Sequence, residues 1–228
     1  MSVVLHMPIL EKPTIAQPAV ERPKRTKLSF DEGLIFAGDF FRERSAVQET
    51  MRRLARRLDE EGVAYAVIGG MALFAHGYAR LTLDVDILLT PEGLRAFQGR
   101  LVGRGYVPAF PGAKKSFVDS ESQIKIEIIT AGEFPGDGLP KPVAFPDPAG
   151  KTVERGNVRI IALENLIELK LASGMTAPHR LRDLADVQDL IIALGLPLEL
   201  MENLDESVRA EYRRLWEAAQ TASEASAR

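Results

Sequence analysis

The chain has 228 residues, of which 46% are hydrophobic and 27% are charged, and its formal net charge at pH 7 is −3. This composition is typical of a globular protein with one larger domain or two small ones, and the slight negative charge argues against a globally basic nucleic-acid binder. The sequence has no cysteine, which excludes disulfides and thiolate metal sites and is compatible with the cytoplasm, where we expect the protein. No apolar run approaches the ~20 residues of a membrane span, and the start lacks the pattern of a signal peptide, so we expect no membrane partner.

The first 30 residues contain four prolines and little periodicity. We therefore predict that residues 1–30 form a poorly ordered N-terminal arm, which ends in a basic cluster at 22–27. This arm is either a solubilising tail or a segment that docks a partner or contacts RNA. The segment 31–41 is apolar enough to pack on the body of the protein.

A helix is predicted from Ser45 to Gly62. Ser45 and Gln48 have the spacing of a capping box, apolar residues then recur at helical intervals, and Gly62 ends the pattern. An apolar strand is predicted over 64–68.

Two glycines, Gly69 and Gly70, separate this strand from a helix-compatible segment, 71–76. Glycines at such a position let the backbone approach a phosphate closely and offer N–H groups at a helix start. Asp84 and Asp86 follow in an apolar, β-branched context, and because side chains alternate along a strand, both carboxylates point the same way. Such a pair is suited to Mg²⁺ bound together with substrate phosphates.

The predicted strand around the aspartates has one polar and one apolar face. Arg80 and Thr82 share the parity of the two aspartates, whereas the opposite parity is apolar and predicts a core face: Leu81, Leu83, Val85 and Ile87. An isolated Asp-x-Asp is also typical of a solvated edge strand with a charged outer face. The upstream glycine pair favours a nucleotide and metal site instead.

The spacing of these polar residues and glycines resembles the nucleotidyltransferase superfamily with the polymerase-β-like fold: Gly69-Gly70, then Arg80-x-Thr82-x-Asp84-x-Asp86. More narrowly, it is similar to the minimal and AbiEii-type nucleotidyltransferases that act as toxins in bacterial toxin–antitoxin systems. The similarity spans roughly residues 47–194. Many superfamily members have Gly-Ser where this chain has Gly-Gly, so one hydroxyl contact to phosphate would be missing here.

This resemblance implies an α+β fold, in which a small mixed or antiparallel sheet forms the nucleotidyltransferase core with flanking helices and a C-terminal helical region. It also implies that the carboxylates bind Mg²⁺, with Mn²⁺ as an alternative, and that a nucleoside triphosphate (NTP) is the co-substrate. In the superfamily a third carboxylate on a neighbouring strand completes the metal site.

Glu127 is the acid in that third position. A helix is predicted from Thr90 to Gly103, followed by paired strands over 116–118 and 123–130, and Glu127 lies on the polar face of the second strand. Its expected role is general base toward the acceptor hydroxyl or support of the metal. The alternative is a half-exposed strand with a charged pair on its outer face.

A domain boundary is predicted in residues 131–150, because five prolines and four glycines exclude regular structure there. The boundary divides the chain into a nucleotidyltransferase core, 31–150, and a C-terminal, mainly helical region, 151–228, that completes the nucleotide cleft.

Two charged residues occupy apolar helix faces in the C-terminal region. Lys170 falls in the middle of the apolar stripe of a helix predicted over 163–173, where a lysine must snorkel, pair with an acid or face an anion. In the toxin-like families a lysine of this helix meets the triphosphate. Asp183 lies on the apolar stripe of the next helix, 178–194, so we expect it to face inward, toward Lys170 or a metal-bound nucleotide.

The segment 180–187 resembles the family's Arg/Lys-Asp-x-x-Asp signature. It adds Arg182 and Asp186 as further candidates, and Asp186 is expected on the solvated face. A last amphipathic helix, near 208–219, is expected to pack on the protein or to meet a partner.

These features predict an enzyme that moves a nucleoside monophosphate from an NTP to an acceptor hydroxyl of RNA, tRNA or protein, as a toxin with an antitoxin as candidate partner. The predicted catalytic and metal-binding residues are Asp84, Asp86 and Glu127; the predicted nucleotide-binding residues are Gly69, Gly70, Arg80, Thr82, Lys170 and Asp183. Three alternatives remain open. They are an antibiotic-modifying nucleotidyltransferase acting on a small molecule, a non-catalytic module that binds a nucleotide or partner, and an Asp-x-Asp glycosyltransferase.

Overall fold

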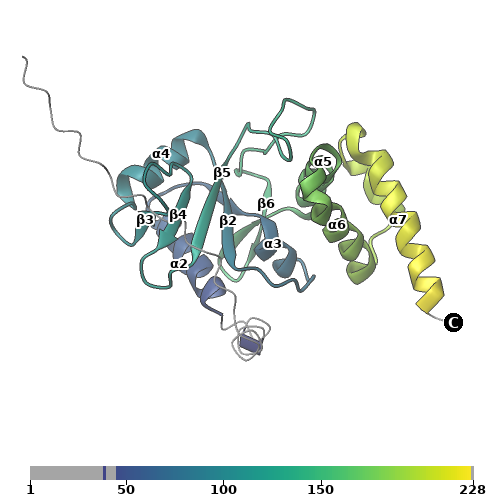
Figure 1. Cartoon of the computed structure of the whole chain (residues 1–228), viewed down its shortest axis with the longest axis horizontal. Coiled ribbons are helices and arrows are strands. Elements are labelled where there is room, and N and C mark those ends of the chain that lie inside the picture. The colour runs from purple at the N-terminus through teal and green to yellow at the C-terminus, as the bar shows by residue number, and fades with distance from the viewer. Residues whose placement is uncertain (1–37, 40–44, 227–228) are drawn as a thin grey trace, which may run out of the picture.

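The computed structural model describes residues 38–39 and 45–226, without the side chains of 222–226. The predictions for the N-terminal arm, and for most of the segment 31–41, therefore lie outside the described residues. A mixed sheet with helices packed on it makes up most of the molecule, and a second group of helices stands beside the sheet (Figure 1).

The sheet has seven strands in the order β3-β4-β5-β2-β1-β7-β6. Their bounds are β1 (Tyr65–Val67), β2 (Asp84–Leu89), β3 (Tyr106–Pro108), β4 (Ser116–Asp119), β5 (Lys125–Thr130), β6 (Thr152–Arg155) and β7 (Val158–Ile161). The pairs β1–β7 and β2–β5 are parallel, and the other neighbours are antiparallel. The predicted α+β class with a mixed sheet is confirmed.

Three helices pack on the strands: α2 (Ala46–Glu60), α3 (Gly69–Ala75) and α4 (Pro91–Arg100). The predicted capping box of α2 is confirmed, since the Ser45 hydroxyl accepts a hydrogen bond from the Gln48 N–H at 3.4 Å and the Ser45 N–H donates to Gln48 Oε1 at 3.0 Å. The start of α4 is also as predicted, because the Thr90 hydroxyl accepts a hydrogen bond from the Gly93 N–H at 2.9 Å.

The helices α5 (Leu163–Thr176), α6 (Leu181–Leu194) and α7 (Glu206–Ser226) pack on one another and form the group beside the sheet, which we call the helical unit (Figure 1). Two short 3-10 helices, η1 (Pro178–Arg180) and η2 (Leu198–Asn203), connect them. Gly195 ends α6 with a left-handed backbone, φ +61°.

Strands β6 and β7 were not predicted. They follow residue 150 and belong to the same sheet as the strands before it, because Val67 of β1 pairs with Ile160 of β7. The region expected to be mainly helical is therefore helical only from Leu163 onward. The division of the chain into two domains near residue 150 stays a prediction.

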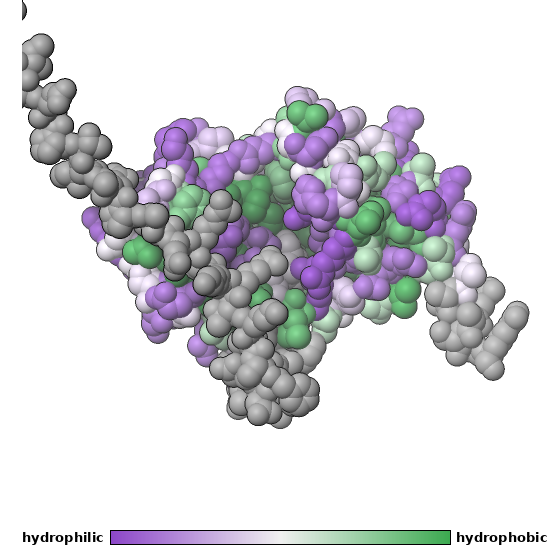
Figure 2. Space-filling view, in the orientation of Figure 1, coloured by the Kyte–Doolittle hydropathy of each residue, from purple (hydrophilic) through white to green (hydrophobic). Residues whose placement is uncertain are grey.

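The core lies between the sheet and its helices. Phe97 of α4 packs on two other aromatic rings, with ring centroids 4.9 Å from Phe117 and 5.4 Å from Tyr106. On the face of the molecule seen in Figure 2, apolar side chains (green) occur in small patches among hydrophilic ones (purple). Within the described residues, no helix combines the length and the apolar character that crossing a membrane requires.

Candidate nucleotide and metal site

Strand β2 carries the two aspartates on one face. Asp84 and Asp86 are its first and third residues, while Val85 and Ile87, on the opposite face, are fully buried. Asp86 pairs in register with Glu127 of the parallel strand β5, so the predicted third acid lies on the neighbouring strand. The backbone thus places the three acids at adjacent positions of the sheet.

The prediction that Leu81 and Leu83 face the core is wrong. Leu81 and Leu83 are 40% and 62% exposed, because the strand begins only at Asp84 and residues 80–83 form a loop without a neighbouring strand. Thr82 nevertheless meets the site, since its hydroxyl donates a hydrogen bond to Asp84 Oδ1 at 2.7 Å.

The two glycines lie directly against the acidic face. Gly69 has φ +64°, and a Cβ at this position would lie 2.0 Å from Asp86 Oδ2. A Cβ at Gly70 would lie 2.7 Å from the Thr82 Cβ. Residues 69 and 70 must therefore be glycine for the backbone to lie this close to Asp86 and Thr82. The role of this backbone in binding a phosphate stays a prediction.

Asp86 is the electrostatic centre of the site. Burial and, after it, the charge of Asp84 raise the pKa of the Asp86 carboxyl to about 7; the charge of Glu127 acts in the same direction, and the charges of Lys170 and Arg180 act against it. Acidic and basic side chains from distant parts of the chain thus converge on one carboxylate. Crowded carboxylates with a raised pKa are typical of sites that bind a cation or exchange a proton.

Glu127 is turned toward other partners. Its carboxylate forms an ion pair with Lys125 and accepts a hydrogen bond from the Ser116 hydroxyl at 3.2 Å. Among the described residues, no three histidine, cysteine, aspartate or glutamate side chains lie in an arrangement that could hold a metal ion. The donor set still fits Mg²⁺, because this ion is commonly bound by one or two carboxylates together with substrate phosphates and water. Asp84 and Asp86 meet that requirement without Glu127.

Lys170 of α5 is buried between two carboxylates of α6. Its amine donates hydrogen bonds to Asp183 Oδ1 at 3.0 Å and to Asp186 Oδ2 at 2.7 Å, and its relative exposure is only 7%. Asp183 also accepts a hydrogen bond from the Ser173 hydroxyl at 2.7 Å. The inward orientation of Asp183, predicted from the helical wheel, is confirmed, and of the two partners considered for it, Lys170 is the one that it binds.

Asp186 was expected on the solvated face, and this prediction is wrong. Asp186 is 2% exposed and binds two cations, because Arg80 Nη1 donates to both of its oxygens, at 3.0 and 2.8 Å, in addition to the contact from Lys170. Arg80, predicted to steady phosphates, is thus held by a carboxylate in this structure. Its Nε is buried without a hydrogen-bond partner among the described residues.

Arg180 was missed by the sequence analysis. Its Nε donates to Asp183 Oδ2 at 2.8 Å and to the Ser173 hydroxyl at 3.2 Å, while the side chain remains 52% exposed. The two Nη groups make no hydrogen bond within the described part of the chain. Arg182, which the signature suggested, is exposed. The spacing of Arg180 and Asp183, three residues apart at a helix start, was the available signal.

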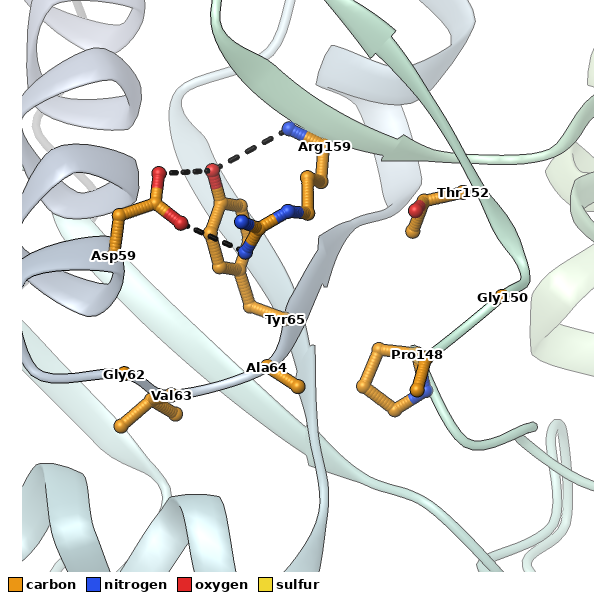
Figure 3. A pocket seen from close by; sticks show the side chains of 10 residues that line it. Asp59, Gly62, Val63, Ala64, Tyr65, Pro148, Gly150, Thr152 and Arg159 are labelled. Atoms are coloured by element: carbon orange, nitrogen blue, oxygen red, sulfur yellow. Dashed lines mark hydrogen bonds and ion pairs between the residues drawn. The ribbon is translucent and has the colours of Figure 1, made fainter.

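Two pockets of the described structure lie elsewhere. One has a volume of about 370 Å³ and is lined by Tyr65, Arg159, Asp59, Thr152 and the turn before β6, among others (Figure 3). Arg159 lies over the Tyr65 ring, 5.2 Å from its centroid, and pairs with Asp59 at 2.7 Å. The second, of about 190 Å³, lies beside α5. None of the candidate residues named above lines either pocket.

No family model matches the sequence, and no protein of curated function matches it either. Among solved structures, the crystal structure of ANT(2″)-Ia in complex with adenylyl-2″-tobramycin is similar at 16% identity, covering 74% of this chain and 97% of that chain, with a TM-score of 0.46. The solution structure of the antibiotic-resistance factor ANT(2″)-Ia is similar at 16% identity, with coverage of 78% and 97% and a TM-score of 0.48. JHP933 from Helicobacter pylori is similar at 15% identity, with coverage of 79% and 93% and a TM-score of 0.38. With TM-scores below 0.5, these similarities assign the chain to no family and to no activity.

Proposed function

We propose that this protein is a metal-dependent nucleotidyltransferase that moves a nucleoside monophosphate from an NTP to an acceptor hydroxyl. The observation that carries the proposal is the convergence on Asp86. Asp84 lies beside it on one face of β2, while the charges of Lys170 in α5 and Arg180 in η1 act on the same carboxylate. A carboxylate pair that lies within the electrostatic influence of basic side chains suits a metal-bound triphosphate.

Asp84 and Asp86 are the proposed ligands of a divalent ion, Mg²⁺ or Mn²⁺. When bound, such an ion neutralises charge on the phosphates and lowers the pKa of an acceptor hydroxyl. The acceptor oxygen forms a bond to the α-phosphorus, the bond from that phosphorus to the bridging oxygen breaks, and pyrophosphate leaves. Glu127 is the proposed base for the hydroxyl proton, once its carboxylate turns from Lys125.

Arg180 is the basic side chain best prepared to bind phosphate. Its Nε is fixed by Asp183 and Ser173, which leaves the two Nη groups of the guanidinium free for phosphate oxygens. Lys170 and Arg80 already have carboxylate partners, so their contribution to phosphate binding is mainly long-range positive charge. Positioning and charge neutralisation account for most of the rate in reactions of this type.

The acceptor is proposed from the sequence resemblance to the toxin-type nucleotidyltransferases, which supports an RNA, tRNA or protein hydroxyl and an antitoxin partner. The alternative acceptor is a small hydroxylated antibiotic. Incubation with labelled NTP and a cell extract, separated into RNA, protein and small-molecule fractions, distinguishes these acceptors by the fraction that carries the label.

The reaction itself is tested by pyrophosphate release with ATP, GTP, CTP and UTP in the presence of Mg²⁺ and the extract. We expect release with at least one NTP and its loss in Asp84→Asn and Asp86→Asn, with Glu217→Gln, an exposed residue of α7, as the matched control. Full activity in either aspartate variant would overturn the proposal. Calorimetry that detects NTP binding without turnover would favour the non-catalytic module.

A further inference from the structure

The long loop between β5 and β6 is fastened to the last turns of α5. Gly136 lies in this loop with φ +77°, and a Cβ at this position would lie 2.3 Å from Thr176 Oγ1 and 2.8 Å from the Ser173 carbonyl oxygen. No other residue type fits at position 136 unless the loop or the helix moves. The loop backbone therefore rests directly on α5.

Lys141 closes the same part of the loop. Its amine donates hydrogen bonds to the Pro135 carbonyl at 2.6 Å and to Thr176 Oγ1 at 3.1 Å, and it also pairs with Asp137. An ammonium group has three protons, and these three partners can use all of them. The side chain is 11% exposed. We call residues 135–141 the strap.

The strap contacts the turn of α5 that supports the basic side chains. Ser173, on whose carbonyl the strap lies, donates its hydroxyl proton to Asp183, and Asp183 in turn binds Lys170 and Arg180. Thr176 donates to the Ala172 carbonyl at 2.7 Å, which ties the strap contact into the helix itself. Ser173 thus connects the strap to the Asp183 carboxylate, which binds both Lys170 and Arg180.

The helical unit has a second side-chain connection to the rest of the molecule, through α6. Tyr78 donates a hydrogen bond to Asp189 at 2.5 Å, and Arg80 binds Asp186. This connection comes from the loop that precedes β2, whereas the strap follows β5. The strands that carry Asp86 and Glu127 are therefore each linked to the helical unit by an adjoining segment.

We propose that the strap holds the helical unit in place against the sheet and so sets the separation between Asp86 and the basic side chains of Lys170 and Arg180. Gly136 and Lys141 are then positioning residues, since neither belongs to the acid pair nor to the cations. The consequence for nucleotide transfer rests on the proposed function, because a triphosphate bound at Asp86 has to reach these cations. A displacement of about 1 Å in such a site can lower the rate about 100-fold.

Spin-label distances test the placement without any substrate. The chain lacks cysteine, so Ser120→Cys, in the turn after β4, and Glu217→Cys, on α7, provide two unique and exposed labelling sites. Gly136→Ala should shift or broaden the distance distribution measured by pulsed EPR. Gly138→Ala is the matched control, because Gly138 also has a left-handed backbone, φ +74°, but its Cβ would have nothing within 4 Å. Its distribution should equal that of the parent.

Lys141→Met serves the same test without adding bulk to the backbone, and it replaces Gly136→Ala if that variant does not fold. It should change the distribution, whereas Thr176→Ser, which keeps the hydroxyl that Lys141 contacts, should not. Unchanged distances in both Gly136→Ala and Lys141→Met would overturn the inference, whatever the activity.

Kinetics with the NTP that supports turnover then separate the two proposals. Gly136→Ala should lower kcat/KM about 100-fold relative to Gly138→Ala. If the distances change as expected but the parent protein shows no turnover with any NTP, the strap is supported and the proposed function fails. If the distances change and kcat/KM does not, the strap has no role in positioning the site.

Discussion

Replacing Asp86 with asparagine removes one charge from a crowded, partly buried group of carboxylates. Burial, followed by the charge of Asp84, raises the pKa of Asp86 from 3.8 to about 7. At about 1.4 kcal/mol per unit, a shift of about three units means that ionising Asp86 in the metal-free protein costs up to about 4 kcal/mol of stability. Asp86→Asn should regain most of this free energy, because asparagine has nearly the same shape.

The gain should depend on pH in a defined direction. In the unfolded chain the carboxyl loses its proton near pH 3.8, whereas in the folded protein it does so near pH 7. Between these values only the unfolded form has released the proton, so the stability of the parent falls as pH rises, and the full cost is present above pH 7. The advantage of Asp86→Asn should thus be absent below pH 4 and largest at pH 8.

Urea denaturation with EDTA present, at intervals from pH 4 to 8, measures this difference. Glu217→Gln, on the exposed face of α7, controls for the loss of one charge and should change little. Mg²⁺ or Mn²⁺ at pH 8 should stabilise the parent and not Asp86→Asn. If Asp86→Asn is no more stable than the parent at pH 8, or if its gain is the same at every pH, the ionised Asp86 carboxylate does not destabilise the folded protein.

Three further predictions use the same structure. Asp186→Ala leaves Arg80 without its carboxylate and Lys170 with Asp183 alone, and it should lower the free energy of unfolding by about 3–5 kcal/mol in urea. A loss below about 1 kcal/mol would contradict the network. Gly69→Ala should lower the melting temperature strongly, because its Cβ would collide with Asp86. The control Gly99→Ala should raise the melting temperature slightly, because Gly99 is exposed in α4 and its Cβ would have nothing within 4 Å. Equal shifts in the two variants would contradict the contact between Gly69 and the acid pair. Arg180→Gln should raise KM for the NTP about 10-fold. It should change the free energy of unfolding by less than about 1 kcal/mol, because the Arg180 side chain is half exposed. The control Arg182→Gln should change neither quantity. An equal effect of the two arginine variants on KM would contradict the assignment.

Periodicity alone predicted which side chains lie on the same face of a strand or point inward from a helix. The parity of β2 placed Asp84 and Asp86 on one face, and the helical wheels of α5 and α6 brought Lys170 and Asp183 together. In these cases a single rotation per residue determines where a side chain points, and the local sequence contains that information.

Residues whose partners lie far away in the chain were predicted less well. Asp186 is buried because Arg80, 106 positions away, supplies its counter-charge, and a helical wheel contains no sign of this. Likewise Leu81 and Leu83 continue the alternation of β2 but face solvent, since no neighbouring strand extends that far.

The hairpin of β6 and β7 was missed although its turn had a local signal. Gly156 and Asn157 are the two residues between the strands, with φ of +54° and +62°. Two left-handed residues form the tight turn that suits a two-residue hairpin, and Gly-Asn is a sequence typical of it. The strands on either side have only four residues each, which is too short for a clear alternation.

The position of the transferred phosphorus decides whether the protein transfers a nucleoside monophosphate. The protein is incubated with Mg²⁺, cell extract and ATP labelled at either the α- or the γ-phosphate, and then with each other NTP labelled in the same two ways. Transfer of a nucleoside monophosphate predicts that the α-label enters an acceptor, that the γ-label appears in pyrophosphate, and that Asp84→Asn and Asp86→Asn abolish both. Entry of the γ-label into the acceptor, or the absence of any transfer with all four NTPs, would exclude nucleotidyl transfer by this protein.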